Sequence, residues 1–133
     1  MSSQITMRRT VIALAIFLSA CASYAPRVGV QGVSDRLFCG RSIPSGGEVT
    51  DAEIDKFVEE VVAPRFPEGF TMWTATGSWD GKEEPTLVLE FLHPYGRRYD
   101  DEVREIADEY RRRFRQESVM RVTLPAMMEF VDE

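Results

Sequence analysis

The stretch Thr86-Leu87-Val88-Leu89-Glu90-Phe91-Leu92 decides the fold of this chain, because its apolar residues run almost without interruption. A strand that is buried on both faces has this pattern, whereas a half-exposed strand alternates apolar and polar residues. We therefore expect residues 86–92 to form a central strand of a sheet. The strand ends near His93, since Pro94 and Gly96 interrupt the pattern.

Two further strands are predicted upstream. Residues 70–76 are rich in β-branched and aromatic side chains, which favour a strand that continues to Trp79. Asp80-Gly81 is a typical turn between paired strands, so this strand and residues 86–92 are expected to form a hairpin. Residues 36–42 form the first expected strand, and a loop with Pro44, Gly46 and Gly47 follows it.

A helix is predicted over about residues 51–62. Thr50 and Glu53 have the spacing of a capping box, in which the threonine side chain accepts a hydrogen bond from the third helical N–H and the glutamate reaches back. An apolar stripe at helical spacing follows, formed by Ile54, Phe57, Val58 and Val61. Pro64 ends the helix, because the residue before a proline is disfavoured in the helical region.

A second helix is expected over residues 100–115. Its apolar stripe consists of Val103, Ile106, Ala107, Tyr110 and Phe114. Acidic residues lie at its start and arginines at its end, which suits the helix dipole. The fourth strand is expected over 119–124; we expect Pro125 to interrupt it and residues 127–131 to continue as an edge segment.

The predicted order is therefore β-α-β-β-α-β. Right-handed crossovers place both helices on one face of a four-stranded antiparallel sheet with strand order 4-1-3-2. This is a ferredoxin-like α+β sandwich of two layers. We expect it to form a single domain over residues 35–133, with Phe57 and Phe114 in its core.

The N-terminus resembles a bacterial lipoprotein signal. Arg8 and Arg9 precede the apolar run of residues 11–18, and Ser19-Ala20-Cys21 follows. This predicts a signal peptide over residues 1–20, acylation (palmitate among the chains) of Cys21, and a flexible tether over 21–34. The alternatives are an ordinary cleaved signal and an uncleaved anchor. We expect a protein of the bacterial cell envelope, lipid-anchored in the outer membrane and facing the periplasm.

Composition excludes several classes of function. The net charge is −6, and removal of the signal would make it more negative, so nucleic acid is not an expected partner. If Cys21 carries lipid, Cys39 is the one remaining thiol, and we expect it to be buried and inert. Glycine-rich phosphate loops and metal-spaced histidines do not occur, so neither a metal nor a cofactor is predicted.

Four segments together resemble a known family. They are Phe38 to Ser42 with Gly46-Gly47, residues 64–71, residues 77–79 and residues 113–122. In these segments the chain resembles domain-of-unknown-function family 3574, a family of small secreted bacterial proteins, over nearly all of residues 36–124. The resemblance implies an exported α+β domain and supplies no catalytic residues.

The candidate ligand-binding residues are Arg41, Arg65, Glu90 and Arg121. Glu90 and Arg121 interrupt apolar strands, so they would be a polar pair on a sheet face or a structural ion pair. Arg65 would bind an anion or cap carbonyl groups at the end of the first helix. No catalytic residue is predicted, and His93, the chain's one histidine, is expected to be a capping or surface residue.

Two functions follow from these residues. The first is a non-catalytic binding or structural module of the envelope, and the alternative is a small-ligand-binding protein or enzyme that uses a polar cleft on the sheet. The strand at 86–92 is apolar on both faces, and the helices cover one face. The other face must be covered by residues 126–131, by a second copy of the chain or by an envelope protein partner.

Overall fold

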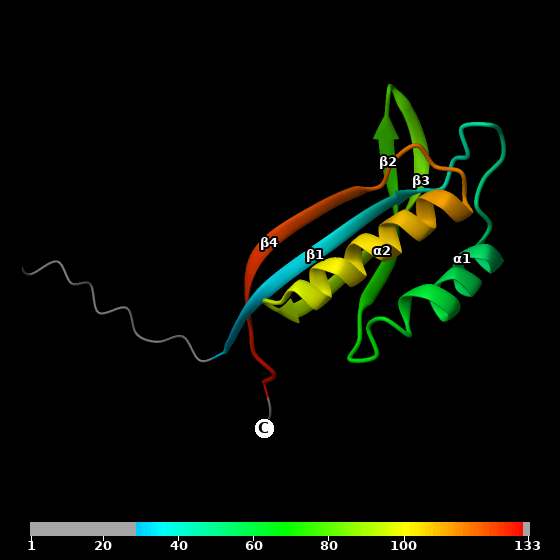
Figure 1. The fold of residues 1–133 in the computed structure, drawn as a ribbon. Coiled ribbons are helices and arrows are strands. Elements are labelled where there is room, and N and C mark those ends of the chain that lie inside the picture. Colours follow the sequence, from blue (N-terminus) through cyan, green and yellow to red (C-terminus); the bar gives the residue numbers. More distant parts are fainter. Residues whose placement is uncertain (1–28, 132–133) are drawn as a thin grey trace, which may run out of the picture.

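The computed structural model describes residues 29–131, which form one antiparallel sheet and two helical segments (Figure 1). The predicted signal peptide and Cys21 lie outside these residues. The strands are β1 (Val30–Gly40), β2 (Thr71–Trp79), β3 (Lys82–Pro94) and β4 (Met120–Met128). The helices are α1 (Asp51–Phe57), which continues as a π-helical turn, η1 (Val58–Val62), and α2 (Arg97–Arg113).

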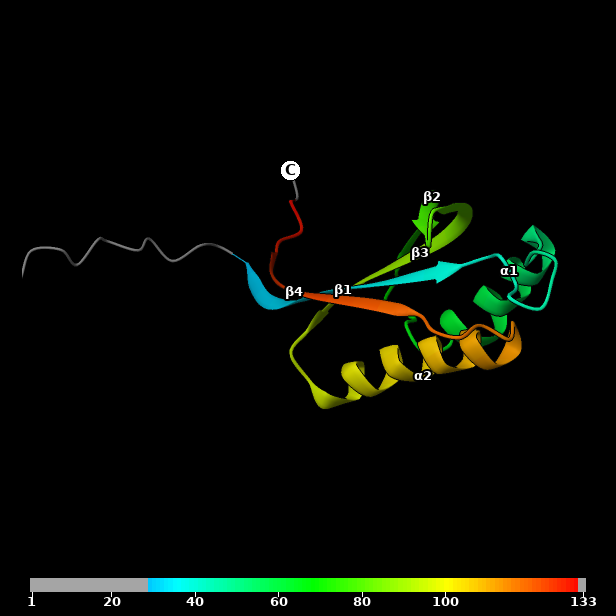
Figure 2. The same cartoon turned by 90° about the horizontal axis from the view of Figure 1, so that it is seen from above.

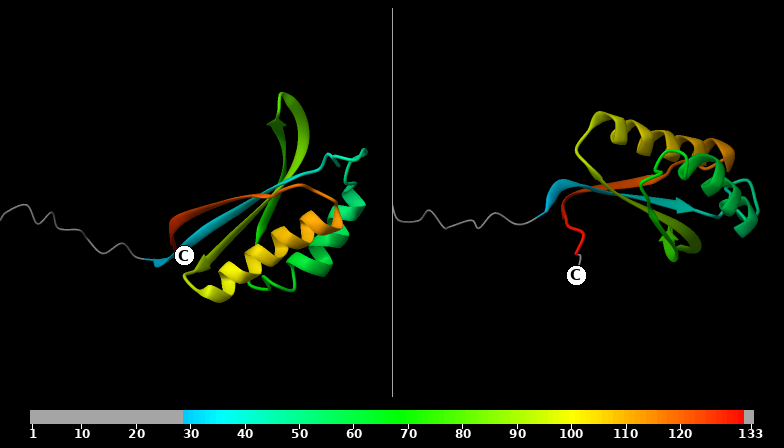
Figure 3. Two further views of the ribbon diagram at one scale, coloured as in Figure 1. Left: turned by 45° about the horizontal axis from the view of Figure 1, so that its top comes forward. Right: turned by 90° about the horizontal axis from the view of Figure 1, so that it is seen from below.

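The sheet has the order β2-β3-β1-β4, and every neighbouring pair is antiparallel. This confirms the expected order. Both helical segments lie on the same side of the sheet (Figures 2 and 3). The arrangement is the predicted ferredoxin-like α+β sandwich, in which β1 and β3 are the central strands.

The first strand begins earlier than its sequence indicates. β1 starts at Val30, so the tether predicted over residues 21–34 is wrong for residues 30–34, and residues 21–28 lie outside the described part. The extension forms because β3 and β4 flank β1 and supply hydrogen bonds on both sides. Gly32 permits the close approach: a Cβ there would lie 2.3 Å from the carbonyl oxygen of His93.

The fourth strand is not interrupted by proline. β4 runs from Met120 to Met128 and includes Pro125, whose missing N–H is tolerated because β4 is an edge strand. Residues 126–128 therefore belong to the sheet itself. Phe130 and Val131 are 95% and 88% exposed, so the tail, one of the three possible covers of the sheet, does not cover it within the described residues.

The core lies between the helices and one face of the sheet. Thr50 and Glu53 form the predicted capping box. Phe57 is fully buried, and its ring contacts Tyr110 and Phe114 at centroid distances of 5.3 and 5.8 Å. Cys39 is a buried free thiol, and burial raises its pKa. Within residues 29–131, no helix is long and apolar enough to cross a membrane.

Candidate functional site

The sheet has a second face that the helices leave uncovered, and its side chains form rows across the strands. Because side chains alternate along a strand, residues paired in register share a face. The first row consists of Met120, Phe38, Val88 and Trp73. The second consists of Val122, Arg36, Glu90 and Thr71, and the third of Leu124, Ser34 and Leu92. We call these three rows the open face.

The open face exposes large apolar side chains. The exposed fractions are 39% for Trp73, 56% for Met120, 56% for Leu92 and 47% for Leu124. Val88 is nearly buried although no helix lies above it, because Phe38 and Trp73 flank it in the first row. Complete burial of a large apolar side chain contributes about 1.5–3 kcal/mol, and these partly exposed side chains forgo part of it. Such a surface is typical of an interaction site.

An ion pair lies next to the apolar row. Arg36 Nε donates to Glu90 Oε1 at 2.8 Å, and the Ser34 hydroxyl donates to the same oxygen at 2.9 Å. The hydrogen bond from Arg36 is the main cause that lowers the pKa of Glu90, and Ser34 adds to it against the effect of burial. The open face therefore carries one anion and one cation side by side at its centre.

Arg121 lies on the opposite face of the sheet from Glu90. It is in register with Leu37, which is in register with Leu89 in the core, so Arg121 points to the helix side. The two residues therefore lie on opposite faces of the sheet, and the predicted Glu90–Arg121 pair is wrong. The residues of β4 on the open face are instead Met120, Val122 and Leu124.

Arg121 binds Asp35, a fully buried carboxylate on β1. Arg121 Nε and Nη2 donate to it at 2.9 and 2.7 Å, and Thr123 also donates to it. Burial acts to raise the pKa of Asp35, but the hydrogen bonds from Arg121, Thr123 and His93 outweigh burial and lower it. Sequence analysis missed Asp35. Its spacing from Leu37 and Cys39, two and four residues away, places it on the core face and could have revealed it.

His93 is part of this cluster and is not at the surface. It is 4% exposed, its Nε2 lies 3.0 Å from Asp35 Oδ2, and its Nδ1 lies 2.9 Å from the Pro94 carbonyl oxygen. Its ring stacks on Tyr99 at 4.9 Å. The expectation of a capping or surface histidine is therefore wrong. Both ring nitrogens lie within hydrogen-bond distance of oxygens of the chain, and the ring is buried.

Arg41 and Arg65 hold the chain together at two other places. The Arg41 side chain is buried; its Nε and Nη2 donate to the Val49 carbonyl oxygen, and Nη2 lies 2.8 Å from Asp51. It thus closes the loop between β1 and α1.

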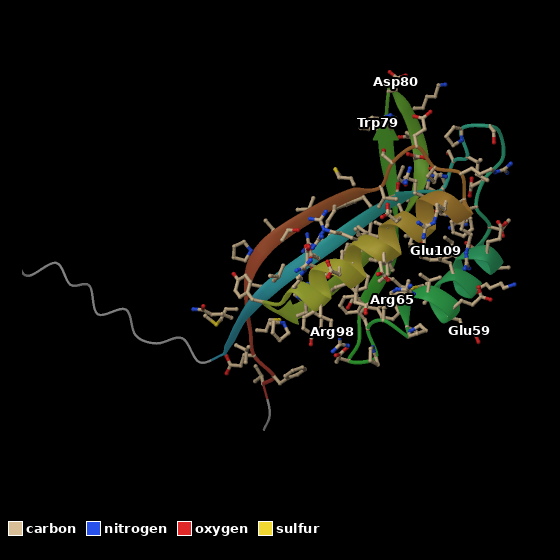
Figure 4. All side chains as sticks on the ribbon, in the orientation of Figure 1. Glu59, Arg65, Trp79, Asp80, Arg98 and Glu109 are labelled. Atoms are coloured by element: carbon tan, nitrogen blue, oxygen red, sulfur yellow. The ribbon has the colours of Figure 1, made fainter. Side chains whose placement is uncertain are left out.

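Arg65 follows η1 and lies against α2 (Figure 4). It donates to the Val61 carbonyl oxygen at 2.9 Å, as expected for a residue that caps a helix end, and also forms ion pairs with Glu102 and Glu105. Arg41, Arg65, Glu90 and Arg121 are therefore four separate contacts and not one cleft.

Two shallow hollows lie elsewhere on the described surface. One is lined by residues 74–76 and 83–85, and the other by Glu53, Lys56, Glu60, Arg113 and Phe114. Neither includes a predicted ligand-binding residue. Among residues 29–131, no His, Cys, Asp and Glu side chains are grouped so that they could hold a metal ion.

Comparison with known proteins identifies the family. The chain belongs to the family described as "Protein of unknown function (DUF3574)", which matches residues 34–130. None of the curated proteins resembles it closely enough to count as a relative.

Two solved structures are similar to this chain at 19% sequence identity. They are a phage SAM lyase in the apo state, with a TM-score of 0.57, and a phage SAM lyase in complex with S-methyl-5'-thioadenosine, with a TM-score of 0.49. Each match covers 80% of this chain and 97% of the other. At this identity the likeness to the apo structure concerns the fold alone.

Proposed function

We propose that this DUF3574 domain is a non-catalytic binding module of the bacterial cell envelope and that its open face binds protein. The observation that carries the proposal is the first row, which presents apolar side chains from all four strands on a face that no described residue covers. A folded domain that leaves such a surface in water loses burial free energy, and contact with another protein recovers it.

The contacts of the polar residues indicate a structural role for these residues and not a catalytic one. Arg41, Arg65 and Arg121 each bind a carboxylate or a carbonyl oxygen of the chain, and His93 has both ring nitrogens occupied. A catalytic site needs groups that are free to contact a substrate. Among the described residues, these side chains already have partners within the fold.

The envelope location rests on the N-terminal sequence. Lipid on Cys21 would hold the domain at the outer membrane, facing the periplasm, and a second acyl chain is what makes such anchoring stable. Val30 is the first strand residue, so the stretch from Cys21 to the sheet is short. The open face would then meet partners within reach of the membrane surface.

The test compares two methionines on edge strands. Met120→Lys adds a charge to the open face, whereas Met72→Lys adds it to the other face of the sheet, where Met72 is 42% exposed. The full chain is extracted from membranes in mild detergent, and its native mass is measured. We expect Met120→Lys to reduce the native mass and Met72→Lys to leave it unchanged. The same mass for Met120→Lys and the unaltered chain, with the fold intact by circular dichroism, would refute the proposal.

The alternative is a small-ligand-binding protein or enzyme, and the fold likeness to a phage SAM lyase is the observation that favours it. The purified chain is incubated with S-adenosylmethionine. The melting temperature of the protein and the consumption of S-adenosylmethionine are both measured. A binding module shows neither a shift nor turnover. A saturable shift, or consumption of the compound, would favour the alternative.

A further inference from the structure

The arrangement of charge and apolar side chains on the open face indicates what covers it. We propose that the occupant is a second copy of the chain, related by a two-fold axis that runs parallel to the strands between β1 and β3. This inference rests on the proposed function, because it names the partner of the same face.

The position of the axis determines which residues meet. When two sheets pack face to face by a two-fold rotation, the axis lies in the plane of the interface. An axis between the two central strands places β1 opposite β3 of the other copy and β4 opposite β2. The strands of the two sheets stay aligned, which is one of the common packing modes of β-sheets.

The first row matches itself under this rotation. Phe38 faces Val88 of the partner subunit, and Met120 faces Trp73 of the partner subunit. All of these side chains are apolar, and Met120 and Trp73 are 56% and 39% exposed. Their burial supplies the free energy of association.

The second row selects this axis over the others. Arg36 faces Glu90 of the partner subunit, so each opposed pair carries opposite charges. An axis along β1 would place Arg36 against its own copy, and an axis along β3 would do the same for Glu90. An axis across the strands through this row would bring both like-charged pairs together. Like charges opposed in an interface cost free energy, so these three axes are disfavoured, and the axis between β1 and β3 is the one that opposes Arg36 to Glu90.

The position of Val30, the first residue of β1, is consistent with the same axis. A rotation about an axis parallel to the strands preserves strand direction, so both copies of Val30 lie at one end of the dimer. The β2–β3 hairpins, with Trp79 and Asp80 at their tips, lie at the other end (Figure 4). The first residue of β1 therefore lies at the same end of the dimer in both copies, which suits two anchors in one membrane. A two-fold axis perpendicular to the strands would send them to opposite ends.

The first experiment is a cross-link between cysteines in the full chain, made with a short bismaleimide. Trp73→Cys and Met120→Cys are combined in one variant; within a single copy these residues lie three strand spacings apart, about 14 Å. Sheets packed face to face lie about 10 Å apart, so facing cysteines of two copies are too distant for a disulfide but within reach of a reagent that cannot span the distance within one copy. We expect a cross-linked dimer on a denaturing gel. The control variant combines Met72→Cys with Met120→Cys and is expected to give no cross-link, because Met72 lies on the other face.

The second experiment separates the contact between copies from the ion pair within one copy. Arg36→Glu and Glu90→Arg are expressed separately, with different tags, and then together. Each variant alone opposes like charges and is expected to lose the dimer. In the mixture, the two substituted side chains face each other with opposite charges, and so do the two unaltered ones. The two variants are therefore expected to co-purify. The internal pair stays broken in both, so stabilisation within one copy cannot restore association.

Two results would overturn the inference: the absence of a cross-linked dimer, or variants that fail to co-purify when mixed. If Met120→Lys still reduces the native mass in that case, the open face binds a different protein and the proposed function stands. If Met120→Lys has no effect either, both fail together.

Discussion

Asp35 and Arg121 are joined by two hydrogen bonds, Nε to Oδ1 at 2.9 Å and Nη2 to Oδ2 at 2.7 Å. The carboxylate is fully buried, and the guanidinium continues to Asp100 on α2, whose Oδ1 lies 2.8 Å from Nη1. One side chain of the edge strand thus connects a central strand to the helix layer. The pair stabilises the position of α2 against the sheet.

Asp35→Asn should destabilise the domain strongly. The amide cannot accept both donors of Arg121, and removal of one partner of a buried ion pair leaves the other uncompensated. We expect a loss of about 3 kcal/mol in the free energy of unfolding, at the lower end of the usual range because Arg121 keeps Asp100. Urea denaturation measures it. Asp55→Asn on the exposed side of α1 is the control, and equal effects of the two substitutions would contradict this role.

The free energy of unfolding should also depend on pH, because the same carboxylate ionises. The pKa of Asp35 in the folded chain lies below its ordinary value of 3.8. A lowered pKa contributes stability that is present above the ordinary value and is lost as the pH falls through the folded pKa. The difference in unfolding free energy between the unaltered chain and Asp35→Asn should be constant near neutral pH and should shrink below about pH 4. A difference that does not change with pH would show that ionisation of Asp35 is irrelevant.

Phe57→Ala should open a large cavity in the core. The ring is fully buried between Tyr110 and Phe114, and truncation of such a side chain costs about 3–5 kcal/mol. Trp79→Ala is the matched control, since this aromatic is 76% exposed at the hairpin tip and should change stability by less than about 0.5 kcal/mol. Thermal or urea denaturation compares the two. A loss below about 1 kcal/mol for Phe57→Ala would contradict its place in the core.

Cys21→Ser should prevent lipid attachment. Serine lacks the thiol that carries the acyl group, so the variant should accumulate as an unprocessed precursor or as a soluble product. Gel mobility and incorporation of radiolabelled palmitate measure this, with Cys39→Ser as the control at the buried thiol. A Cys21→Ser variant that is still processed and membrane-bound would refute the lipoprotein prediction.

Local patterns in the sequence determined the elements and their order. The capping box at Thr50, the apolar stripes of both helices and the continuous apolar run at residues 86–92 each arise from neighbours along the chain, and the structure contains all of these elements. Handedness of the crossovers then limited the topology to one strand order. These features can be predicted because residues close together in the sequence form the periodic pattern that buries one side of a helix or strand.

Only the tertiary structure decided the extent of the outer strands and the partners of the polar residues. β1 begins at Val30 and β4 passes through Pro125, because pairing with neighbouring strands compensates for weak local preference. The register places Glu90 and Arg121 on opposite faces of the sheet. Glu90 pairs with Arg36, and Arg121 pairs with Asp35. A shift of one residue would exchange the two faces, and register depends on contacts between distant segments. The pairing of Arg36 with Glu90 on the open face is a product of that register, so no local pattern could identify it.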